Sequence, residues 1–278
     1  SVPLRWKTLC PDAETFELET PLAQLAWCEH HELIVMAGPV ISFREEDLPD
    51  WLNTGQIDFA SLQSRCRAFT SQCVEQLKDR VDLWHATAGM NRILDTTLSE
   101  EHSLLLAIDT VEVIRRHDPQ KPVIVSFQQP WGEYLSRFHR DLSPFHFADA
   151  LVRADLINGI GLEINWQHAV GSTLPRDLVA LSNELDRWTL LEMPLVIFLA
   201  APTGDLADSE DCSANYIEQL LAVILGRPSV QVVVWTQLQD TSQHTAGRCG
   251  LLDSEGREKP LLQVFQRLST RLKTSQAA

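Results

Sequence analysis

Short apolar segments rich in β-branched residues alternate with longer segments of helical periodicity along the whole chain. Three of the short segments are nearly continuous apolar runs: Pro-Val-Ile-Val-Ser-Phe at 122–127, Pro-Leu-Val-Ile-Phe-Leu at 194–199 and Val-Gln-Val-Val-Val-Trp at 230–235. Such runs are typical of strands buried on both faces, as in a parallel sheet covered by helices. The sequence predicts strands at residues 2–6, 33–43, 81–88, 122–128, 157–165, 194–200 and 229–237.

Helical patterns fill the intervals between these strands. Thr97-Leu98-Ser99-Glu100 has the form of a capping box, and Ser143-Pro144 has the form of a cap followed by a first-turn proline. Apolar residues at helical spacing predict further helices at 20–31, 57–79, 178–188, 217–224 and 260–272.

This repeated βα order contains no Gly/Ser linker, which indicates one α/β domain. A TIM-type (β/α)8 barrel needs eight βα units, whereas the sequence supplies seven strands and begins directly in one of them. We therefore expect a single barrel domain over residues 1–278, whose first βα unit is missing or supplied by sequence upstream of Ser1, as part of a larger polypeptide. An open doubly wound sheet is the competing fold, but it favours a Gly-rich phosphate loop after an early strand, which the sequence lacks.

The charge of the chain argues against two classes of partner. Its 23 Lys and Arg residues against 38 Asp and Glu residues give a net charge of −15. Nucleic acid and anionic lipid both require a basic surface, so neither is expected as a partner. No apolar run reaches the roughly 18 residues that a membrane-spanning helix needs.

Metal and cofactor chemistry are not indicated either. The sequence contains no C-x-x-C, H-x-H or H-E-x-x-H pattern, and no G-x-S-x-G that would mark a serine nucleophile. We therefore expect no metal and no cofactor. The cysteines are interpreted as apolar core thiols: Cys10, Cys28, Cys66, Cys73, Cys212 and Cys249.

Five stretches carry motifs in a fixed order. They are Gly38-Pro-Val-Ile-Ser-Phe with Leu48-Pro-Asp-Trp-Leu, Val81-Asp-Leu-Trp-His-Ala-Thr-Ala-Gly, Ile160-Gly-Leu-Glu-Ile-Asn-Trp, Leu191-Glu-Met-Pro-Leu-Val-Ile-Phe-Leu, and Val234-Trp235 with Gly250-Leu-Leu-Asp and Lys259-Pro260. In this order they resemble the G-H-x-L-V-W … L-P-x-W-L, V-x-x-W-D-V-V-N-E, I-G-L-Q-x-H-W, L-G-L-P-I-x-I-T-E and V-W-G … L-x-D … K-P stretches of the family-10 glycoside hydrolases, the β-1,4-xylanase barrels. The resemblance covers about residues 1–268.

The resemblance implies a TIM barrel with a sugar-binding face, and it places the catalytic positions of the family at Gly89 and Leu199. A retaining glycosidase needs two carboxyl groups about 5–5.5 Å apart, one to protonate the leaving oxygen and one to attack the anomeric carbon. Glycine and leucine do neither, so hydrolysis by the usual two glutamates is not expected. Because xylanase relatives are usually exported, the resemblance also implies a secreted or cell-envelope protein.

Other carboxylates are predicted at the C-terminal ends of the strands, where active sites of such barrels lie. Glu163 ends the strand predicted at 157–165, and Glu133 follows the strand predicted at 122–128. They are the best substitute pair for acid and nucleophile. In the alternative interpretation Glu163 is a hydrogen-bonding rim residue and Glu133 a solvated loop charge.

Tryptophans and amides are expected to form the sugar-binding surface. We predict Trp84, Trp131, Trp166 and Trp235 at or just past strand C-termini, where flat indoles stack on sugar faces. The family resemblance assigns Trp235 to the floor of the sugar site. The predicted hydroxyl partners are His85, Gln128, Gln129, Asn165 and Gln237. The alternative is barrel packing, with the indole N–H groups satisfied inside the protein.

Three hypotheses therefore remain. The first is a barrel module that binds β-linked, xylan-like polysaccharide or oligosaccharide, with other domains of the same chain as further partners. The second is an active glycosidase that uses Glu163 and Glu133. The third is a structural scaffold without a ligand. Fold and function are separable in such barrels, so the fold alone does not decide between them.

Overall fold

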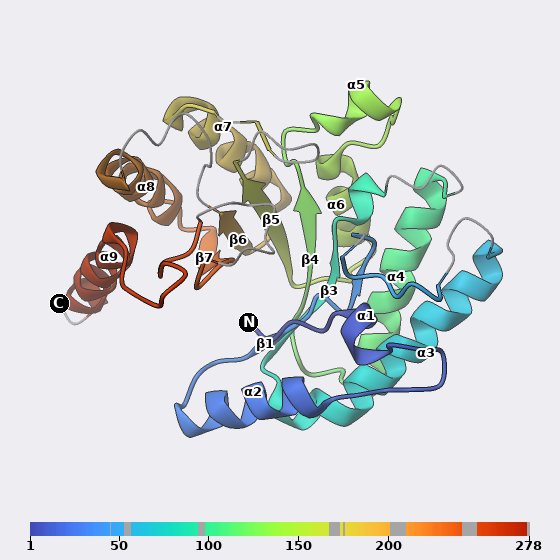
Figure 1. The fold of residues 1–278 in the computed structure, drawn as a ribbon. Coiled ribbons are helices and arrows are strands. Elements are labelled where there is room, and N and C mark those ends of the chain that lie inside the picture. The colour runs from blue at the N-terminus through green and yellow to red at the C-terminus, as the bar shows by residue number, and fades with distance from the viewer. Residues whose placement is uncertain are drawn as a thin grey trace. The chain divides into compact units, whose positions relative to one another are not determined.

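The structure is a computed structural model of the 278-residue chain. It describes residues 1–44, 46–52, 57–93, 98–166, 173–174, 176–200, 210–240 and 249–276, without the side chains of 210–213 and 271–276. Figure 1 shows the fold with its elements labelled.

Strands and helices alternate along the chain. The strands are β1 (Met36–Ala37), β2 (Ile41–Ser42), β3 (Leu83–Ala88), β4 (Val123–Gln128), β5 (Gly159–Asn165), β6 (Leu195–Ala200) and β7 (Val230–Trp235). The α-helices are α1 (Trp6–Leu9), α2 (Glu19–His30), α3 (Phe59–Leu77), α4 (Glu100–His117), α5 (Tyr134–Phe138), α6 (Pro144–Arg153), α7 (Leu178–Trp188), α8 (Glu210–Leu225) and α9 (Pro260–Gln276). Three short 3-10 helices are η1 (Lys78–Arg80), η2 (Met90–Arg92) and η3 (Thr189–Leu191).

The order of the strands in the sheet decides between the two expected folds. The sheet runs β1-β3-β4-β5-β6-β7, with β2 also beside β3, and the pairings of β1, β2 and β4 with β3 and of β6 with β7 are parallel. From β3 to β7 successive strands are thus neighbours, as in a singly wound βα barrel, whereas a doubly wound sheet reverses its order at a switch point. The predicted TIM-type fold is confirmed, with seven strands in the described part of the chain.

The strands from β3 onward agree with the prediction, but the first two predicted strands differ from it. Val2 forms only an isolated bridge with Ala37, and the chain enters α1 at Trp6. The Trp6 ring stacks on Phe69 of α3 with ring centroids 4.8 Å apart, so packing on a helix replaces strand pairing there. The predicted strand 33–43 is divided into β1 and β2 at Gly38, whose φ is 129°.

Gly38 is required by a close approach of two backbones. A Cβ at this position would lie 2.1 Å from the carbonyl oxygen of His85 in β3. The following Pro39 has no N–H to donate, so regular pairing with β3 stops here and resumes at Ile41.

Four of the helices in the described part of the chain begin at a side-chain cap. Asp58 accepts a hydrogen bond from Ser61 N (2.9 Å), and Asp177 accepts one from Ala180 N (2.7 Å). Ser143 accepts one from His146 N (3.2 Å), with Pro144 in the first turn, as predicted. The cap of α4 is Ser99, which accepts from His102 N at 3.1 Å, whereas the predicted Thr97 lies outside the described residues. Each such bond satisfies one of the N–H groups that a helix start leaves unpaired.

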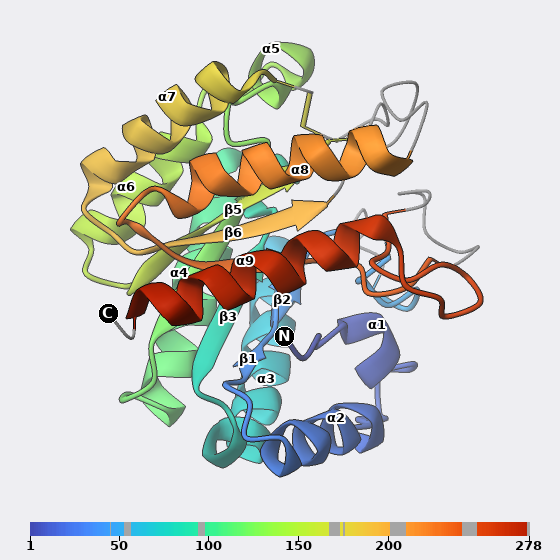
Figure 2. The same ribbon diagram turned by 90° about the vertical axis from the view of Figure 1, so that its left-hand side faces the viewer.

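The described residues fall into two compact units: Ser1–Gln128 with Tyr134–Leu162, and Gln129–Glu133 with Glu163–Ala278. In the first unit α3 and α4 lie side by side (Figure 1). Asp109 of α4 joins them, because its carboxylate accepts hydrogen bonds from Gln63 Nε2 (2.5 Å) and Arg67 Nη2 (2.6 Å) of α3. In the second unit β6 is completely buried, and α8 and α9 lie side by side (Figure 2).

Four cysteines lie in the core as predicted: Cys10, Cys66, Cys73 and Cys249. Cys28 on α2 is half-buried, and the side chain of Cys212 lies outside the described residues. Burial raises the thiol pKa of Cys10 to about 11 and those of Cys66 and Cys249 to about 12.

These thiols give a test of the core. Because the thiolate is the reactive form, the buried cysteines with raised pKa values are expected to resist iodoacetamide at pH 8 in the native protein. Cys28 is expected to react before Cys66 and Cys249, and time-resolved mass spectrometry of the labelled peptides measures the order. Labelling of Cys66 as fast as that of Cys28 would contradict the described packing, while labelling in denaturant serves as the control.

The close approach at Gly38 gives a second test. Gly38→Ala is expected to lower the free energy of unfolding by about 3 kcal/mol or more, because the new Cβ would collide with the backbone of β3. Gly256→Ala is the matched control, since Gly256 also has a positive φ of 81° but its Cβ would meet nothing nearer than 4.0 Å. Its expected cost is about 1 kcal/mol. Equal urea midpoints for the two variants would refute this assignment.

Candidate functional site

The position that the family resemblance assigns to the acid/base is occupied by a cluster without a carboxyl group. Gly89 follows β3 in a left-handed conformation (φ 66°) and starts η2. A Cβ on Gly89 would lie 3.0 Å from Cδ of Gln128, so the Gln128 side chain covers this glycine. Arg92 Nη1 donates to Gln128 Oε1 at 2.9 Å, and Asn91 exchanges two hydrogen bonds with the Gln128 backbone, at 2.8 and 3.1 Å.

Asn91 and Arg92 were not among the site residues predicted from the sequence. The available signal was their position directly after Gly89, past the end of β3. Together with Gln128 they offer amide and guanidinium donors, which bind oxygen atoms but transfer no proton at neutral pH. This cluster is therefore suited to binding rather than to acid catalysis.

The position that the resemblance assigns to the nucleophile is occupied by a buried aliphatic side chain. Leu199 lies near the end of β6 with 0% of its surface exposed, and it is in register with Trp235 of β7. Thr236 N donates to the Leu199 carbonyl at 3.0 Å, which continues the ladder past Trp235. Neither of the two family positions therefore presents a carboxylate.

The substitute pair proposed from sequence lies on two separate segments of the second unit. Glu163 in β5 is 9% exposed, and its carbonyl accepts a hydrogen bond from Thr173 Oγ1 at 3.3 Å. Leu174 N donates to Glu133 Oε1, also at 3.3 Å, and Arg176 lies 3.6 Å from the same oxygen. Adjacent residues of the Thr173–Leu174 segment thus contact both glutamates. The alternative interpretation of Glu133 as a solvated charge is wrong, because only 11% of its side chain is exposed.

A third carboxyl group near Glu133 was missed by the sequence analysis. Glu184 on α7 accepts a hydrogen bond from Trp188 Nε1 at 2.9 Å and lies 3.4 Å from Arg187. Burial raises the pKa of Glu184, and the charge of Glu133 adds to this effect. The helical i, i+4 spacing of Glu184 and Trp188 was the available signal, but it is equally typical of core packing.

Two of the four predicted tryptophans are buried and do not present an indole face. Trp84 is 0% exposed and is the second residue of β3, so its predicted place at a strand C-terminus is wrong. Its Nε1 donates to Asp118 Oδ2 at 2.8 Å, which ties β3 to the end of α4. Trp166 does follow β5, but it is 1% exposed and packs against Tyr216 with ring centroids 5.8 Å apart. Both indoles are packed in the interior. The alternative interpretation also required satisfied indole N–H groups, and this holds only for Trp84, because Trp166 Nε1 is buried and has no hydrogen-bond partner among the described residues.

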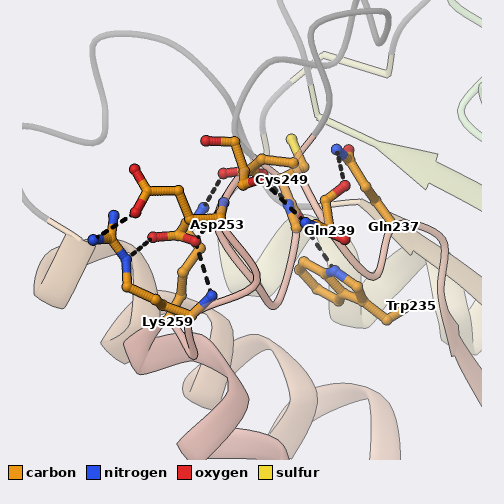
Figure 3. A network of polar contacts seen from close by, with 11 residues as sticks. Trp235, Gln237, Gln239, Cys249, Asp253 and Lys259 are labelled. Atoms are coloured by element: carbon orange, nitrogen blue, oxygen red, sulfur yellow. Dashed lines mark hydrogen bonds and ion pairs between the residues drawn. The ribbon is translucent and has the colours of Figure 1, made fainter.

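The other two tryptophans are half-buried and each is held by a neighbour. Trp131 follows β4, and the Arg176 guanidinium carbon lies 5.8 Å from the centre of its ring. Trp235 ends β7, and its Nε1 donates to the Cys249 carbonyl at 3.0 Å (Figure 3). Its ring meets Phe265 of α9 edge to face, with centroids 5.3 Å apart. Both indoles thus keep part of their surface accessible in a fixed orientation.

The predicted hydroxyl partners differ in accessibility. His85 is 3% exposed, and its Nε2 lies 2.8 Å from Ser126 Oγ inside the sheet. Gln129 and Gln237 are also buried, and Gln237 donates to the Gln239 carbonyl at 3.2 Å (Figure 3). Gln128 and Asn165 are half-buried, and Asn165 Oδ1 is a buried atom without a hydrogen-bond partner in the described part of the chain. Gln128 and Asn165 are therefore the more accessible polar candidates.

Metal binding and membrane insertion find no support in the described part of the chain. Within these residues no three His, Cys, Asp or Glu side chains gather in a way that could hold a metal ion. None of the helices described is both long and apolar enough to cross a bilayer.

Comparison with known proteins identifies the fold. The sequence matches no family model and no curated protein. Among solved structures, xylanase 10B from Thermotoga petrophila in complex with xylobiose is 15% identical, with a TM-score of 0.75 over 96% of this chain and 83% of that one. Native xylanase 10B from Thermotoga maritima is 14% identical, with a TM-score of 0.74 over 98% and 85%.

An intracellular xylanase from Thermoanaerobacterium saccharolyticum, solved as a variant with xylotetraose, is 14% identical, with a TM-score of 0.72 over 94% of this chain and 84% of that one. At such low identity these likenesses concern the fold and not the chemistry. The chain has the fold of the family-10 xylanases, in a strongly divergent sequence.

Proposed function

We propose that this protein binds β-linked, xylan-like polysaccharide and does not hydrolyse it by the two-glutamate mechanism, as one module of a larger polypeptide. The observation that carries the proposal is the pair of half-buried, oriented indoles, Trp131 and Trp235, on a fold whose solved relatives hold xylobiose and xylotetraose.

The chemistry of these indoles suits a sugar ligand. A pyranose ring has an apolar face of C–H groups that packs against a flat aromatic surface, while its hydroxyl rim needs hydrogen-bond partners. Trp131 is fixed by Arg176 and Trp235 by the Cys249 carbonyl, so little side-chain entropy is lost when a sugar binds. Asn165, which is half-buried in the same compact unit as both indoles, carries an amide group for the hydroxyl rim.

The absence of turnover follows from the two family positions. Protonation of a glycosidic oxygen and attack on the anomeric carbon each need a carboxyl group. Gly89 is covered by Gln128, and Leu199 is fully buried, so neither position could accept a carboxylate without rearrangement of its neighbours. Binding would therefore persist where hydrolysis is lost.

An active glycosidase with relocated carboxylates is the second candidate. It is favoured by the Thr173–Leu174 segment, which contacts both Glu163 and Glu133. Against it, the Glu133 carboxylate is already engaged by Leu174 N and Arg176, which restrains it from attack on a sugar. A scaffold without a ligand is the function that remains if neither binding nor hydrolysis is observed.

Glycan affinity tests the first candidate. In native affinity electrophoresis with soluble xylan, the wild-type protein is expected to be retarded, and Trp235→Ala and Trp131→Ala are each expected to weaken binding roughly tenfold through loss of apolar contact area. Trp27→Ala is the matched control, because Trp27 is 57% exposed on α2 but is not among the tryptophans predicted to bind sugar. Unretarded wild-type protein, or full retention by Trp235→Ala, would reject glycan binding by these indoles.

Hydrolysis separates the binding hypothesis from the hypothesis of relocated carboxylates. Neither the wild-type protein nor Glu163→Gln is expected to release reducing sugar from xylan, since Gly89 and Leu199 occupy the positions where the family has its catalytic carboxylates. The relocated-carboxylate hypothesis requires turnover by the wild-type protein that Glu163→Gln abolishes and Glu19→Gln, a change at an exposed position of α2, leaves intact. That second pattern would overturn the proposal.

A further inference from the structure

The segment that follows β7 folds back on itself beside Trp235. Leu252 bridges Gln239 on one side and Glu258 on the other, and Asp240 N donates to the Leu252 carbonyl at 3.0 Å. Lys259 N donates to the Leu251 carbonyl, also at 3.0 Å. These backbone bonds bring the side chains of Asp240 and Lys259 together next to the Cys249–Gly250 peptide.

Asp240 and Lys259 form a shielded ion pair. Lys259 Nζ lies 3.1 Å from Asp240 Oδ2, and each side chain is only 11% exposed. Solvent and salt screen such a pair weakly, and removal of Lys259 would take this ion-pair partner from the buried Asp240 carboxylate. The pair therefore fixes the Asp240 carboxylate in one orientation.

The other oxygen of this carboxylate holds a peptide group. Asp240 Oδ1 accepts a hydrogen bond from Gly250 N at 2.7 Å. The carbonyl of the same peptide group, at Cys249, accepts the indole N–H of Trp235 at 3.0 Å. A carboxylate on the N–H side polarises the peptide and strengthens the bond that its carbonyl accepts. The indole, the peptide and the carboxylate thus form one continuous chain of hydrogen bonds that ends at Lys259.

Close packing holds this peptide in its place. A Cβ on Gly250 would lie 2.5 Å from Asp240 N and 2.6 Å from the Leu252 carbonyl, so the backbone approaches Asp240 as closely as glycine alone permits. On its other side the Trp235 ring meets Phe265. Trp235 is therefore restrained at its ring and at its nitrogen by two independent contacts.

We propose that the Asp240–Lys259 ion pair positions Trp235 for glycan binding, acting through the Cys249–Gly250 peptide. The glycan part of this inference rests on the proposed function, whereas the positioning of the indole does not. Neither Asp240 nor Lys259 needs to touch the sugar. Their effect on affinity arises because an indole that is free to rotate must be ordered when the sugar binds.

The same segment contains a matched control. Arg257 Nε pairs with Asp253 Oδ2 at 2.6 Å, but this pair is more exposed, with 70% of the Arg257 side chain accessible. Asp253 accepts hydrogen bonds from the backbone of residues 255 and 257, which lie within its own turn. Arg257→Met thus removes an ion pair of the same segment without affecting the chain of contacts to Trp235.

The test follows the indole N–H of Trp235 by NMR in the full chain labelled with 15N-tryptophan, with Trp235→Phe to assign the signal. In Lys259→Met its hydrogen exchange is expected to be roughly tenfold faster or more, and the Kd for xylohexaose roughly tenfold higher. Arg257→Met and Lys259→Arg are expected to resemble the wild-type protein in both measurements. If Lys259→Met does not fold, Asp240→Asn serves in its place, because it retains an amide oxygen for Gly250 N but loses the charge.

Each result has a defined meaning. Unchanged indole exchange in Lys259→Met, or equal acceleration in Arg257→Met, overturns the proposal. If exchange is faster only in Lys259→Met and the wild-type protein does not bind xylohexaose, the positioning of Trp235 is supported and the glycan function is overturned. Faster exchange together with weaker binding supports both.

Discussion

A parallel sheet requires every strand to be followed by a connection that returns the chain to the starting edge. The carboxyl ends of all strands therefore gather at one end of the sheet, and side chains in the loops that follow them are available for chemistry. In this protein the strands are neighbours in the order in which they occur along the chain, so this constraint acts from β3 to β7. What the protein can do depends on the few residues that occupy these loops.

Two positions at the ends of strands show how this chain can have the fold of the family-10 xylanases without their two catalytic carboxylates. After β3 the backbone turns through a left-handed glycine, Gly89, and the space above it is taken by Gln128. At the end of β6 the side chain is Leu199, buried against the neighbouring strand. A carboxylate at either place would displace packed neighbours, so the packing around these two positions agrees with the absence of an acid there.

Much of the fold followed from the sequence, because apolar runs and caps are local signals. The strands β3 to β7 and the cap at Ser143 were predicted within a few residues. The division of the strand at Gly38 was not, because it depends on a contact with His85, more than forty residues away in the sequence. For the same reason the burial of Trp84 was missed, since its partner Asp118 belongs to another element.

The candidate site was less predictable than the fold. Residue type identified Trp131 and Trp235, but only the structure distinguishes these half-buried indoles from the fully buried Trp166. The contacts that hold them, from Arg176 and the Cys249 carbonyl, come from segments whose register no periodicity reveals. Residue type therefore narrows the candidates, and tertiary packing determines which of them remain accessible.

The central claim is binding without cleavage, and one sample can test both parts. Xylohexaose is added to 15N-tryptophan-labelled protein, the indole signals are recorded, and the sugar is then analysed by mass spectrometry after prolonged incubation. The account predicts shifted signals for Trp131 and Trp235 and an intact hexasaccharide. Shorter xylo-oligosaccharides in the sample, or indole signals that do not move at saturating sugar, would contradict it.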